Sequence, residues 1–175
     1  MALTRHPPPG WSLPEIPGPP GSSPRVRRIA IETEARPDLC LFLDGELYLE
    51  SMDLPGQLAT LRGRGSMART RCAAIPFETP AARAIDYTCN EAFNAWLLNE
   101  VLPALGHSPD RITIAGLSLS ALGALFAAIR HPGVFSRCIA QSPSAWWRRE
   151  WLRGDVAGRD LRGTRFRLSV GSEET

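Results

Sequence analysis

Residues 111–125, Arg-Ile-Thr-Ile-Ala-Gly-Leu-Ser-Leu-Ser-Ala-Leu-Gly-Ala-Leu, constrain the fold of this chain more than any other segment. A short β-branched run, Ile112 to Ala115, leads into a Gly-x-Ser-x-small turn, and an apolar helical pattern follows directly. This order is typical of a nucleophile elbow, in which a sharp turn between a strand and a helix exposes a serine hydroxyl at the edge of a sheet. Gly116 provides the small residue that this turn requires. The segment predicts that Ser118 is a nucleophile for acyl transfer; the alternative is that Ser118 only caps the helix.

The rest of the chain alternates short apolar runs with helical patterns. Strands are expected at residues 26–33, 39–43, 72–77, 112–115, 137–141 and 166–170. Helices are expected at residues 54–61, at 91–105 with Asn90 as N-cap, and after Ser118 as far as His131. Because strands that alternate with helices form a largely parallel sheet covered on both faces, the expected class is α/β.

A chain of 175 residues is long enough for one domain with a substantial core and too short for two. Residues 1–24 contain half of the prolines, so we expect a disordered or extended Pro/Gly-rich tail. The alternative is a polyproline ligand for another domain. Residues 25–175 are expected to form the folded domain.

The composition argues against several classes of function. The net charge of +2 gives no reason to expect binding to nucleic acid or to a membrane surface. The N-terminus lacks the apolar stretch of a signal peptide, and no segment approaches the ~20 apolar residues of a membrane span. The cysteines form no C-x-x-C pair, which argues against a zinc site. We therefore expect a cytoplasmic protein with reduced thiols, no metal and no cofactor.

A nucleophilic serine also needs hydrogen-bond donors for the oxyanion, and a base. The backbone N–H of Leu119 at the start of the helix is one candidate donor, and the turn Asp44-Gly45-Glu46 after an apolar strand is the other. The alternative for Asp44-Gly45-Glu46 is an ordinary turn at a strand end. Glu173 and Glu174 follow the last strand, where a triad acid can lie, but a solvated chain end explains them equally well.

No histidine is well placed to serve as the base. His6 lies in the tail, and His107 precedes the strand that leads to Ser118. His131 is a full helix length, roughly 15 Å by the helix rise, from the serine hydroxyl. Without a base the hydroxyl remains a weak nucleophile, so the site is expected to be incomplete within these residues.

Several blocks, in the right order, resemble the enterochelin (ferric-catecholate siderophore) esterases, within the putative-esterase branch of the α/β-hydrolases. They are Phe42-Leu43-Asp44-Gly45-Glu46, Glu50-Ser51-Met52, Arg83-Ala84-Ile85-Asp86-Tyr87-Thr88-Cys89-Asn90, Glu100-Val101-Leu102-Pro103, Ala115-Gly116-Leu117-Ser118, and Gln141-Ser142-Pro143-Ser144-Ala145-Trp146-Trp147. Leu168-Ser169-Val170-Gly171 with Glu174 is similar to the strand that leads to the family's acid region. Together the blocks extend from about Leu39 to the last residue.

The resemblance implies an α/β-hydrolase-type fold and serine-dependent hydrolysis of the ester bonds of a catecholate trilactone siderophore. It assigns Ser118 as the nucleophile and places Glu174 in the acid region. It also implies that Arg83 and Asp86 form an ion pair that shapes the site, and that Trp146 and Trp147 line a pocket for catechol rings. The alternative for the tryptophans is that both pack beneath the loop.

The chain departs from the family pattern at three places. Ser120 and Ala121 stand where glycines are usual, and Asp86 stands where glutamate is usual. The family's Gly-Gly-His-Asp-like block with the catalytic histidine is absent, so we expect a C-terminally truncated α/β-hydrolase domain. Two alternatives remain, a non-catalytic binding protein that retains the pocket and a related thioester hydrolase or acyltransferase. Seven arginines between Arg148 and Arg167 are expected to form a solvated, lid-like insertion.

Overall fold

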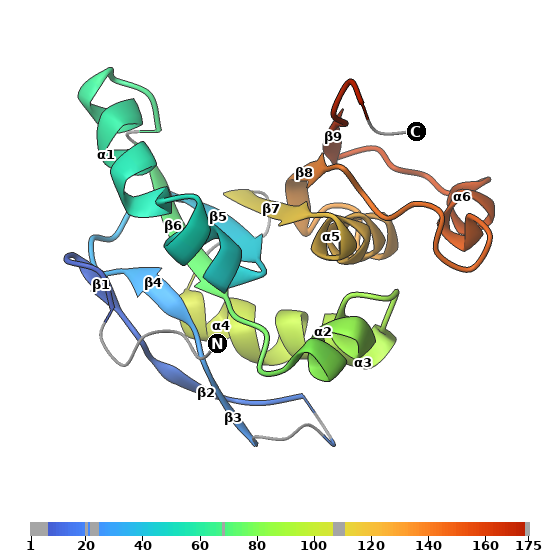
Figure 1. Cartoon of the computed structure of the whole chain (residues 1–175), viewed down its shortest axis with the longest axis horizontal. Helices are drawn as coiled ribbons and strands as arrows, with labels where there is room; N and C mark the ends of the chain where they lie inside the picture. The colour runs from blue at the N-terminus through green and yellow to red at the C-terminus, as the bar shows by residue number, and fades with distance from the viewer. Residues whose placement is uncertain (1–6, 20, 22–24, 68, 107–110, 174–175) are drawn as a thin grey trace.

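A seven-stranded, mostly parallel sheet forms the centre of the computed structural model, which describes residues 7–19, 21, 25–67, 69–106 and 111–173 (Figure 1). The strands lie in the order β1 (Trp11–Ser12), β4 (Ala30–Glu32), β6 (Thr70–Ile75), β5 (Asp38–Leu43), β7 (Ile112–Leu117), β8 (Phe135–Gln141) and β9 (Arg165–Ser169). Strands β6, β5, β7, β8 and β9 run parallel to one another. Strand β4 pairs antiparallel with β6, and β1 pairs antiparallel with β4. A separate hairpin pairs β2 (Glu15–Pro17) with β3 (Val26–Arg28).

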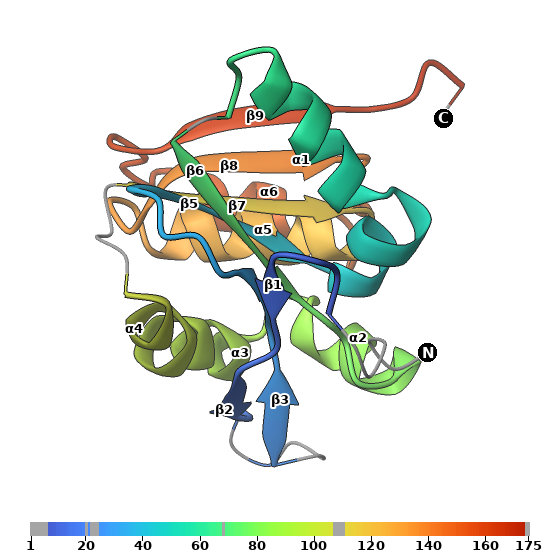
Figure 2. The ribbon, with the colours of Figure 1, turned by 90° about the vertical axis from the view of Figure 1, so that its left-hand side faces the viewer.

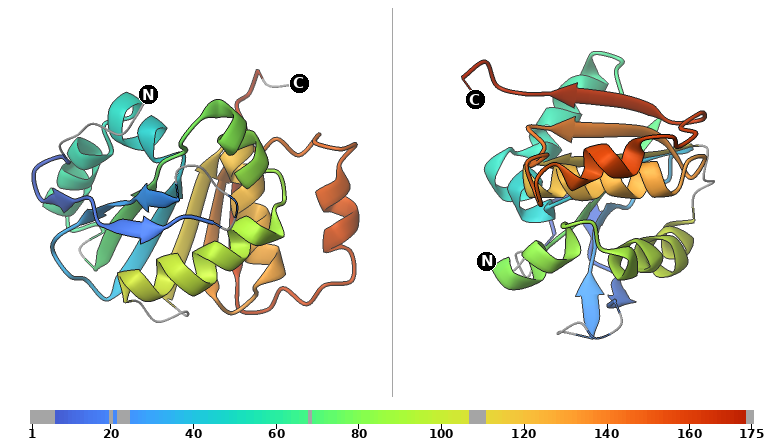
Figure 3. Two further views of the ribbon diagram at one scale, coloured as in Figure 1. Left: turned by 90° about the horizontal axis from the view of Figure 1, so that it is seen from below. Right: turned by 90° about the vertical axis from the view of Figure 1, so that its right-hand side faces the viewer.

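Helices cover both faces of the sheet (Figures 2 and 3). One face is covered by the π-helix η1 (Leu47–Ser51) and by α1 (Leu54–Gly63). The other face carries α2 (Pro80–Asp86), α3 (Glu91–Trp96), the π-helix η2 (Leu97–Val101), α4 (Leu102–Leu105), α5 (Leu119–Arg130) and α6 (Trp151–Val156). The expected α/β class, with a mostly parallel sheet between helices, is confirmed.

The central strand β5 shows why the sheet is buried on both faces. Leu39, Leu41 and Leu43 are fully buried in the core beneath α5, whereas Cys40 belongs to the smaller core beneath α1. Successive side chains of a strand point to opposite faces, so a continuous apolar run places its residues in both cores. The strand expected at residues 39–43 is confirmed, extended by Asp38.

The expectation of a disordered tail at residues 1–24 is wrong for residues 11–17. Trp11 lies in β1 and Ile16 in β2, with 7% and 4% of their surfaces exposed. These two buried side chains provide apolar contacts that the Pro-rich composition gave no reason to expect. Pro17 is tolerated because it lies at the end of its strand. The strand expected at residues 26–33 is divided between β3 in the hairpin and β4 in the main sheet.

The helix expected at residues 91–105 is present, as the continuous run α3, η2 and α4. Asn90 caps it as expected, because its side-chain oxygen accepts hydrogen bonds from the backbone N–H groups of Ala92 and Phe93. Two short helices, α2 and α6, were not expected from the sequence. In the part of the chain that the structure describes, none of the helices is both long and apolar enough to cross a membrane.

Candidate active site

The elbow predicted around Ser118 is present between β7 and α5. Ser118 has φ 57° and ψ −115°, a strained conformation for a residue with a side chain, and it is exposed to solvent. A Cβ atom at Gly116 would lie 2.3 Å from the backbone oxygen of Ser120 and 2.7 Å from the backbone nitrogen of Ala121. Because no side chain fits there, the turn depends on glycine at this position.

The structure explains how the elbow accommodates Ser120 in place of a glycine. The Ser120 hydroxyl is completely buried, accepts a hydrogen bond from the Leu117 N–H and donates one to the Leu117 carbonyl, each at 2.9 Å. Ala121, also fully buried, packs in the core on the first turn of α5. Ser120 therefore closes the turn with its own hydrogen bonds.

The loop after β8 holds the elbow from the neighbouring strand. The Ser118 N–H donates to the carbonyl of Gln141 at 2.9 Å, and the Ser144 N–H donates to the carbonyl of Ser118 at 3.1 Å. The hydroxyl oxygens of Ser118 and Ser144 are 3.4 Å apart, and Ser144 is 6% exposed. Ser144 is thus a polar neighbour of the candidate nucleophile that sequence reasoning did not single out.

The turn Asp44-Gly45-Glu46 lies beside the elbow because β5 and β7 are adjacent parallel strands that end at the same edge of the sheet. A Cβ atom at Gly45 would lie 3.0–3.1 Å from the backbone of residues 74–76, so the turn presses against the end of β6. Leu119 begins α5, where the N–H groups of the first turn have no partner within the helix. The topology therefore brings the three expected oxyanion donors Leu119, Gly45 and Glu46 to one edge.

Glu46 differs from an ordinary surface carboxyl group. It is 2% exposed, and its Oε2 accepts a hydrogen bond from the Phe77 N–H at 3.1 Å. Burial raises its pKa to about 7, the charges of Asp44 and Glu50 add to the increase, and the backbone N–H groups of Glu46 and Phe77 oppose it. Because the Glu46 N–H helps to stabilise the charged form of its own carboxyl group, we take the Gly45 N–H as the second candidate oxyanion donor.

The ion pair expected between Arg83 and Asp86 is wrong. Arg83 instead holds Asp44, with its Nε 2.8 Å from Oδ1 and its Nη2 2.6 Å from Oδ2. Asp86 pairs with Arg27 of the N-terminal hairpin at 2.8 Å, and both side chains are almost fully buried. Although three residues apart on one helix, Arg83 and Asp86 each meet an opposite charge from another element in a desolvated position.

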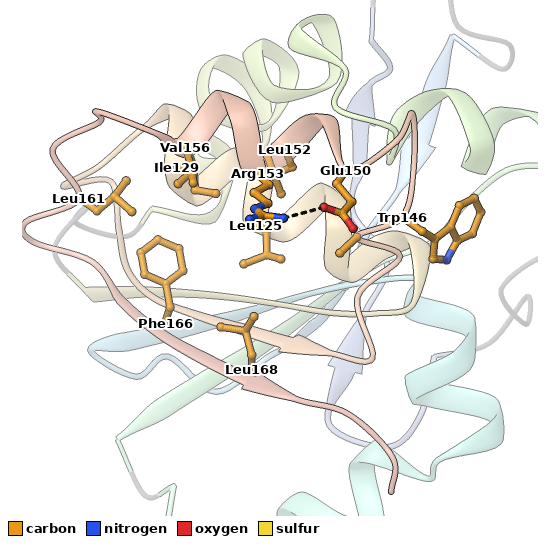
Figure 4. Close-up of a pocket in the computed structure, with 11 residues that line it drawn as sticks. Leu125, Ile129, Trp146, Glu150, Leu152, Arg153, Val156, Leu161, Phe166 and Leu168 are labelled. Carbon is orange, nitrogen blue, oxygen red and sulfur yellow. Dashed lines mark hydrogen bonds and ion pairs between the residues drawn. The ribbon is translucent and has the colours of Figure 1, made fainter. Parts of the chain in front are cut away.

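The two tryptophans expected in the substrate pocket have different surroundings. Trp146 is 73% exposed and lies at one end of an apolar cavity of about 380 Å³ (Figure 4). Trp147 packs edge-on against Trp151 at 6.1 Å between ring centroids, and the Arg148 guanidinium lies over its ring at 4.6 Å. Trp146 can therefore contact a ligand, whereas Trp147 matches the packing alternative.

The cavity beside Trp146 lies between α5, α6 and β9, as the side chains in Figure 4 show. Its walls are mainly apolar: Leu125, Ile129, Leu152, Val156, Leu161, Phe166 and Leu168. Glu150 and Arg153 form an ion pair at 3.1 Å beside it, with both side chains largely exposed. The segment that was expected to be a lid-like insertion thus contains a short helix, α6, which forms one wall of this cavity.

The structure does not bring together the remaining members of the expected catalytic group. His6, His107 and Glu174 lie outside the described residues, and Glu173 is exposed beyond β9. His131 follows the far end of α5, about 18 Å from Ser118 by the rise of twelve helical residues. Burial lowers its pKa, and the charge of Arg130 adds to the decrease. Among the described residues, no histidine lies beside Ser118.

Sequence reasoning also missed Tyr87. Its hydroxyl accepts a hydrogen bond from the Asp44 N–H at 3.1 Å, and the side chain is fully buried. Arg83 and Tyr87 are four residues apart, which places them on one face of a helix. That spacing is readable in the sequence, but it becomes a signal only once residues 80–86 are known to be helical.

A family model described as Putative esterase matches residues 67–175, more than half of the chain. The iron(III) enterobactin esterase of Escherichia coli is 31% identical in an alignment that covers 79% of this chain. The chain belongs to the putative-esterase family, and enterobactin esterases are among its relatives.

Comparison with solved structures shows that the similarity between this chain and its relatives extends to the fold. The enterobactin esterase of Shigella flexneri, in the presence of 2,3-dihydroxy-N-benzoyl-serine, superposes with a TM-score of 0.81 at 26% identity over 94% of this chain. The siderophore hydrolase EstA of Aspergillus nidulans shares the fold, with a TM-score of 0.73 at 19% identity over 94% of this chain and 70% of its own. The chain spans 40% of the length of the E. coli relative and 47% of the Shigella structure.

Proposed function

We propose that this chain carries the nucleophilic part of a serine esterase site, with Ser118 as the nucleophile. The observation that carries the proposal is the strained, exposed elbow, with φ 57° and ψ −115° at Ser118. A non-glycine residue keeps such a conformation only where the surrounding structure enforces it, and such strain gathers at functional sites. A serine that merely caps a helix has extended backbone angles and accepts a hydrogen bond from the first turn; Ser118 makes no such side-chain bond.

The chemistry follows from what surrounds the hydroxyl. Ser118 Oγ attacks the ester carbonyl carbon and gives its proton to a base; collapse of the tetrahedral intermediate breaks the bond to the alcohol oxygen, which leaves with a proton. Water then hydrolyses the acyl-enzyme. The Leu119 and Gly45 N–H groups are suited to hold the negative oxygen. Since His131 lies at the far end of α5, the described residues do not supply the base, and we expect little turnover from these 175 residues alone.

For the substrate we propose an ester of a catecholate siderophore, because the relatives include iron(III) enterobactin esterase. The exposed indole of Trp146 is suited to stack on an aromatic ring. Exposed arginines of the segment after β8, Arg148, Arg149 and Arg153, would attract an anionic ferric complex. Within the chain, this loop and the elbow are joined by the hydrogen bond between Ser144 and Ser118.

A fluorophosphonate probe at high concentration and long incubation tests the nucleophile, because this strongly electrophilic reagent modifies slowly even a serine without its base where oxyanion donors hold the P=O oxygen. Intact-mass spectrometry should detect one adduct on the wild-type chain, and peptide mapping should place it on Ser118. Ser136→Ala, which removes a hydroxyl near the opposite end of β8, should still be labelled, whereas Ser118→Ala should not. A folded wild-type chain that forms no adduct, or an adduct that persists in Ser118→Ala, would contradict the proposal.

A second candidate is a non-catalytic binding protein, favoured by the distance between Ser118 and the described histidine, His131. It is distinguished by titrating the chain with iron(III) enterobactin. Quenching of tryptophan fluorescence that is lost in Trp146→Ala, without an adduct on Ser118 and without released product, would favour binding over catalysis. Trp151→Phe is a suitable control, because Trp151 packs against Phe126 and Trp147.

A further inference from the structure

Asp44 occupies an unusual position for a charged residue. It lies directly after β5, is completely buried, and has φ 60°, in the left-handed region. The next residue, Gly45, is pressed against the end of β6 and has no room for a side chain. Left-handed backbone is uncommon at a non-glycine residue, although aspartate adopts it more readily than most, and at Asp44 neighbouring groups hold it. The structure shows two such groups, both on or directly after α2.

Arg83 holds the side chain of Asp44. Its guanidinium makes two parallel hydrogen bonds to the carboxylate, at 2.8 and 2.6 Å, in a geometry that fixes orientation as well as distance. The bond to Asp44 raises the pKa of Arg83 further, so the guanidinium stays charged. A fully buried carboxylate requires such a partner, and Asp44 therefore depends on Arg83 for its position.

Tyr87 holds the backbone of the same residue. Its hydroxyl accepts the hydrogen bond of the Asp44 N–H at 3.1 Å, and its ring packs edge-on against Phe93 at 5.4 Å between centroids. A Cβ atom at Gly123 of α5 would lie 3.2 Å from Tyr87, so the two segments are in close contact. Tyr87 thus connects the Asp44–Glu46 turn to α5, whose first turn follows Ser118.

We propose that Arg83 and Tyr87 are positioning residues that hold the Asp44–Glu46 turn, through Asp44, in the geometry that binds the oxyanion. This inference rests on the proposed function and changes the role of Arg83, which was expected to shape the site through an ion pair with Asp86. Arg83 and Tyr87, four residues apart, hold Asp44 at two points. Arg83 binds its carboxylate, and Tyr87 binds its backbone N–H. The Gly45 N–H then keeps its place relative to Ser118, because α5 contacts the same tyrosine.

The test compares Tyr87→Phe, which removes only the hydroxyl, and Arg83→Lys with the matched control Arg62→Lys. Arg62 makes the same kind of two-bond contact with the buried carboxylate of Glu32, on the opposite side of the sheet from α2. Two measurements are made on the whole chain. Amide hydrogen exchange of residues 45 and 46 measures how firmly the Asp44–Glu46 turn is held. The maximal rate of Ser118 modification by the fluorophosphonate measures oxyanion stabilisation.

We expect both test variants to speed amide exchange at residues 45 and 46 by roughly fivefold or more, the effect of losing one hydrogen bond. The maximal modification rate should fall roughly tenfold or more, with half-saturating probe concentration unchanged, because an oxyanion donor acts in the transition state. Arg62→Lys should lower the unfolding temperature without either effect.

Two results would overturn the inference. In one, residues 45 and 46 exchange in the test variants as they do in Arg62→Lys; in the other, exchange accelerates while the modification rate stays at the wild-type value. If the wild-type Ser118 does not react at all, the proposed function fails. Amide exchange then decides alone whether Arg83 and Tyr87 hold the turn.

Discussion

The buried carboxyl group of Glu46 makes the stability of this protein depend on pH in a direction that can be worked out from the structure. Glu46 is 2% exposed, and burial raises its pKa from the ordinary value of 4.5 to about 7. Asp44 and Glu50 add to this increase through charge repulsion, while the N–H groups of Glu46 and Phe77 reduce it. The folded protein therefore holds a proton that the unfolded chain has released between these two pH values.

The sign follows from proton linkage. Where the folded state binds more protons than the unfolded state, the free energy of unfolding falls as pH rises. The contribution of Glu46 is complete below pH 4.5, declines as pH rises, and is fully lost above the folded-state pKa of about 7. The difference between these two pKa values corresponds to a change of about 3 kcal/mol in the free energy of unfolding. This figure is an upper bound, because the charged turn can relax and admit water.

Glu46→Gln removes the titrating group but retains an acceptor for the Phe77 N–H. We expect the variant to match the wild type or be less stable at pH 4.5, and to gain about 1–3 kcal/mol relative to it by pH 8.5. Urea unfolding at several pH values measures this difference. Groups such as Asp86, Glu78 and His131, whose pKa values are also shifted, contribute equally to both proteins and cancel.

The matched control is Glu50→Gln, on the exposed side of η1 and four residues away. Because Glu50 makes the smallest contribution to the raised pKa of Glu46, this variant should leave the pH dependence of unfolding close to that of the wild type. The reasoning is refuted if the stability difference between Glu46→Gln and the wild type stays constant from pH 4.5 to 8.5. It is also refuted if Glu50→Gln produces the same change.

Two further predictions concern the elbow and the hairpin. Gly116→Ala places a Cβ atom against the backbone of α5, so we expect a loss of about 1–3 kcal/mol and slower Ser118 labelling. Gly154→Ala, inside α6 with open space around its Cβ, should leave labelling unchanged and keep or slightly raise stability. Equal thermal unfolding of the two variants would contradict this. Asp86→Asn leaves the buried charge of Arg27 without its partner and should cost about 3–5 kcal/mol in urea unfolding. Glu15→Gln, which removes an exposed ion-pair partner from the same hairpin, should cost at most about 1 kcal/mol, and an equal cost for both would count against the argument.

Short-range patterns in the sequence were sufficient for the elbow and for the longer helices. Gly116 and Ser118 lie two residues apart, and the strand before them and the helix after them show their own periodicities. Asn90 marked the start of the helix at residues 91–105 through a cap that involves only its next few neighbours. The short helices α2 and α6 span too few turns for a periodic signal. For residues 11–17 the prediction of disorder was wrong, because it relied on the proline content and gave no weight to two apolar side chains that the fold buries.

The sequence by itself determined the α/β class and the position of the candidate nucleophile, because both depend on residues close together along the chain. Only the tertiary structure decided the partners of Arg83 and Asp86, which come from a distant turn and a distant strand, and the different exposures of Trp146 and Trp147. A buried charged side chain pairs with whichever opposite charge the packing of the elements brings next to it, and side-chain type alone cannot specify that partner. The expected ion pair had the right residues for a salt bridge, but folding gave each of them another partner.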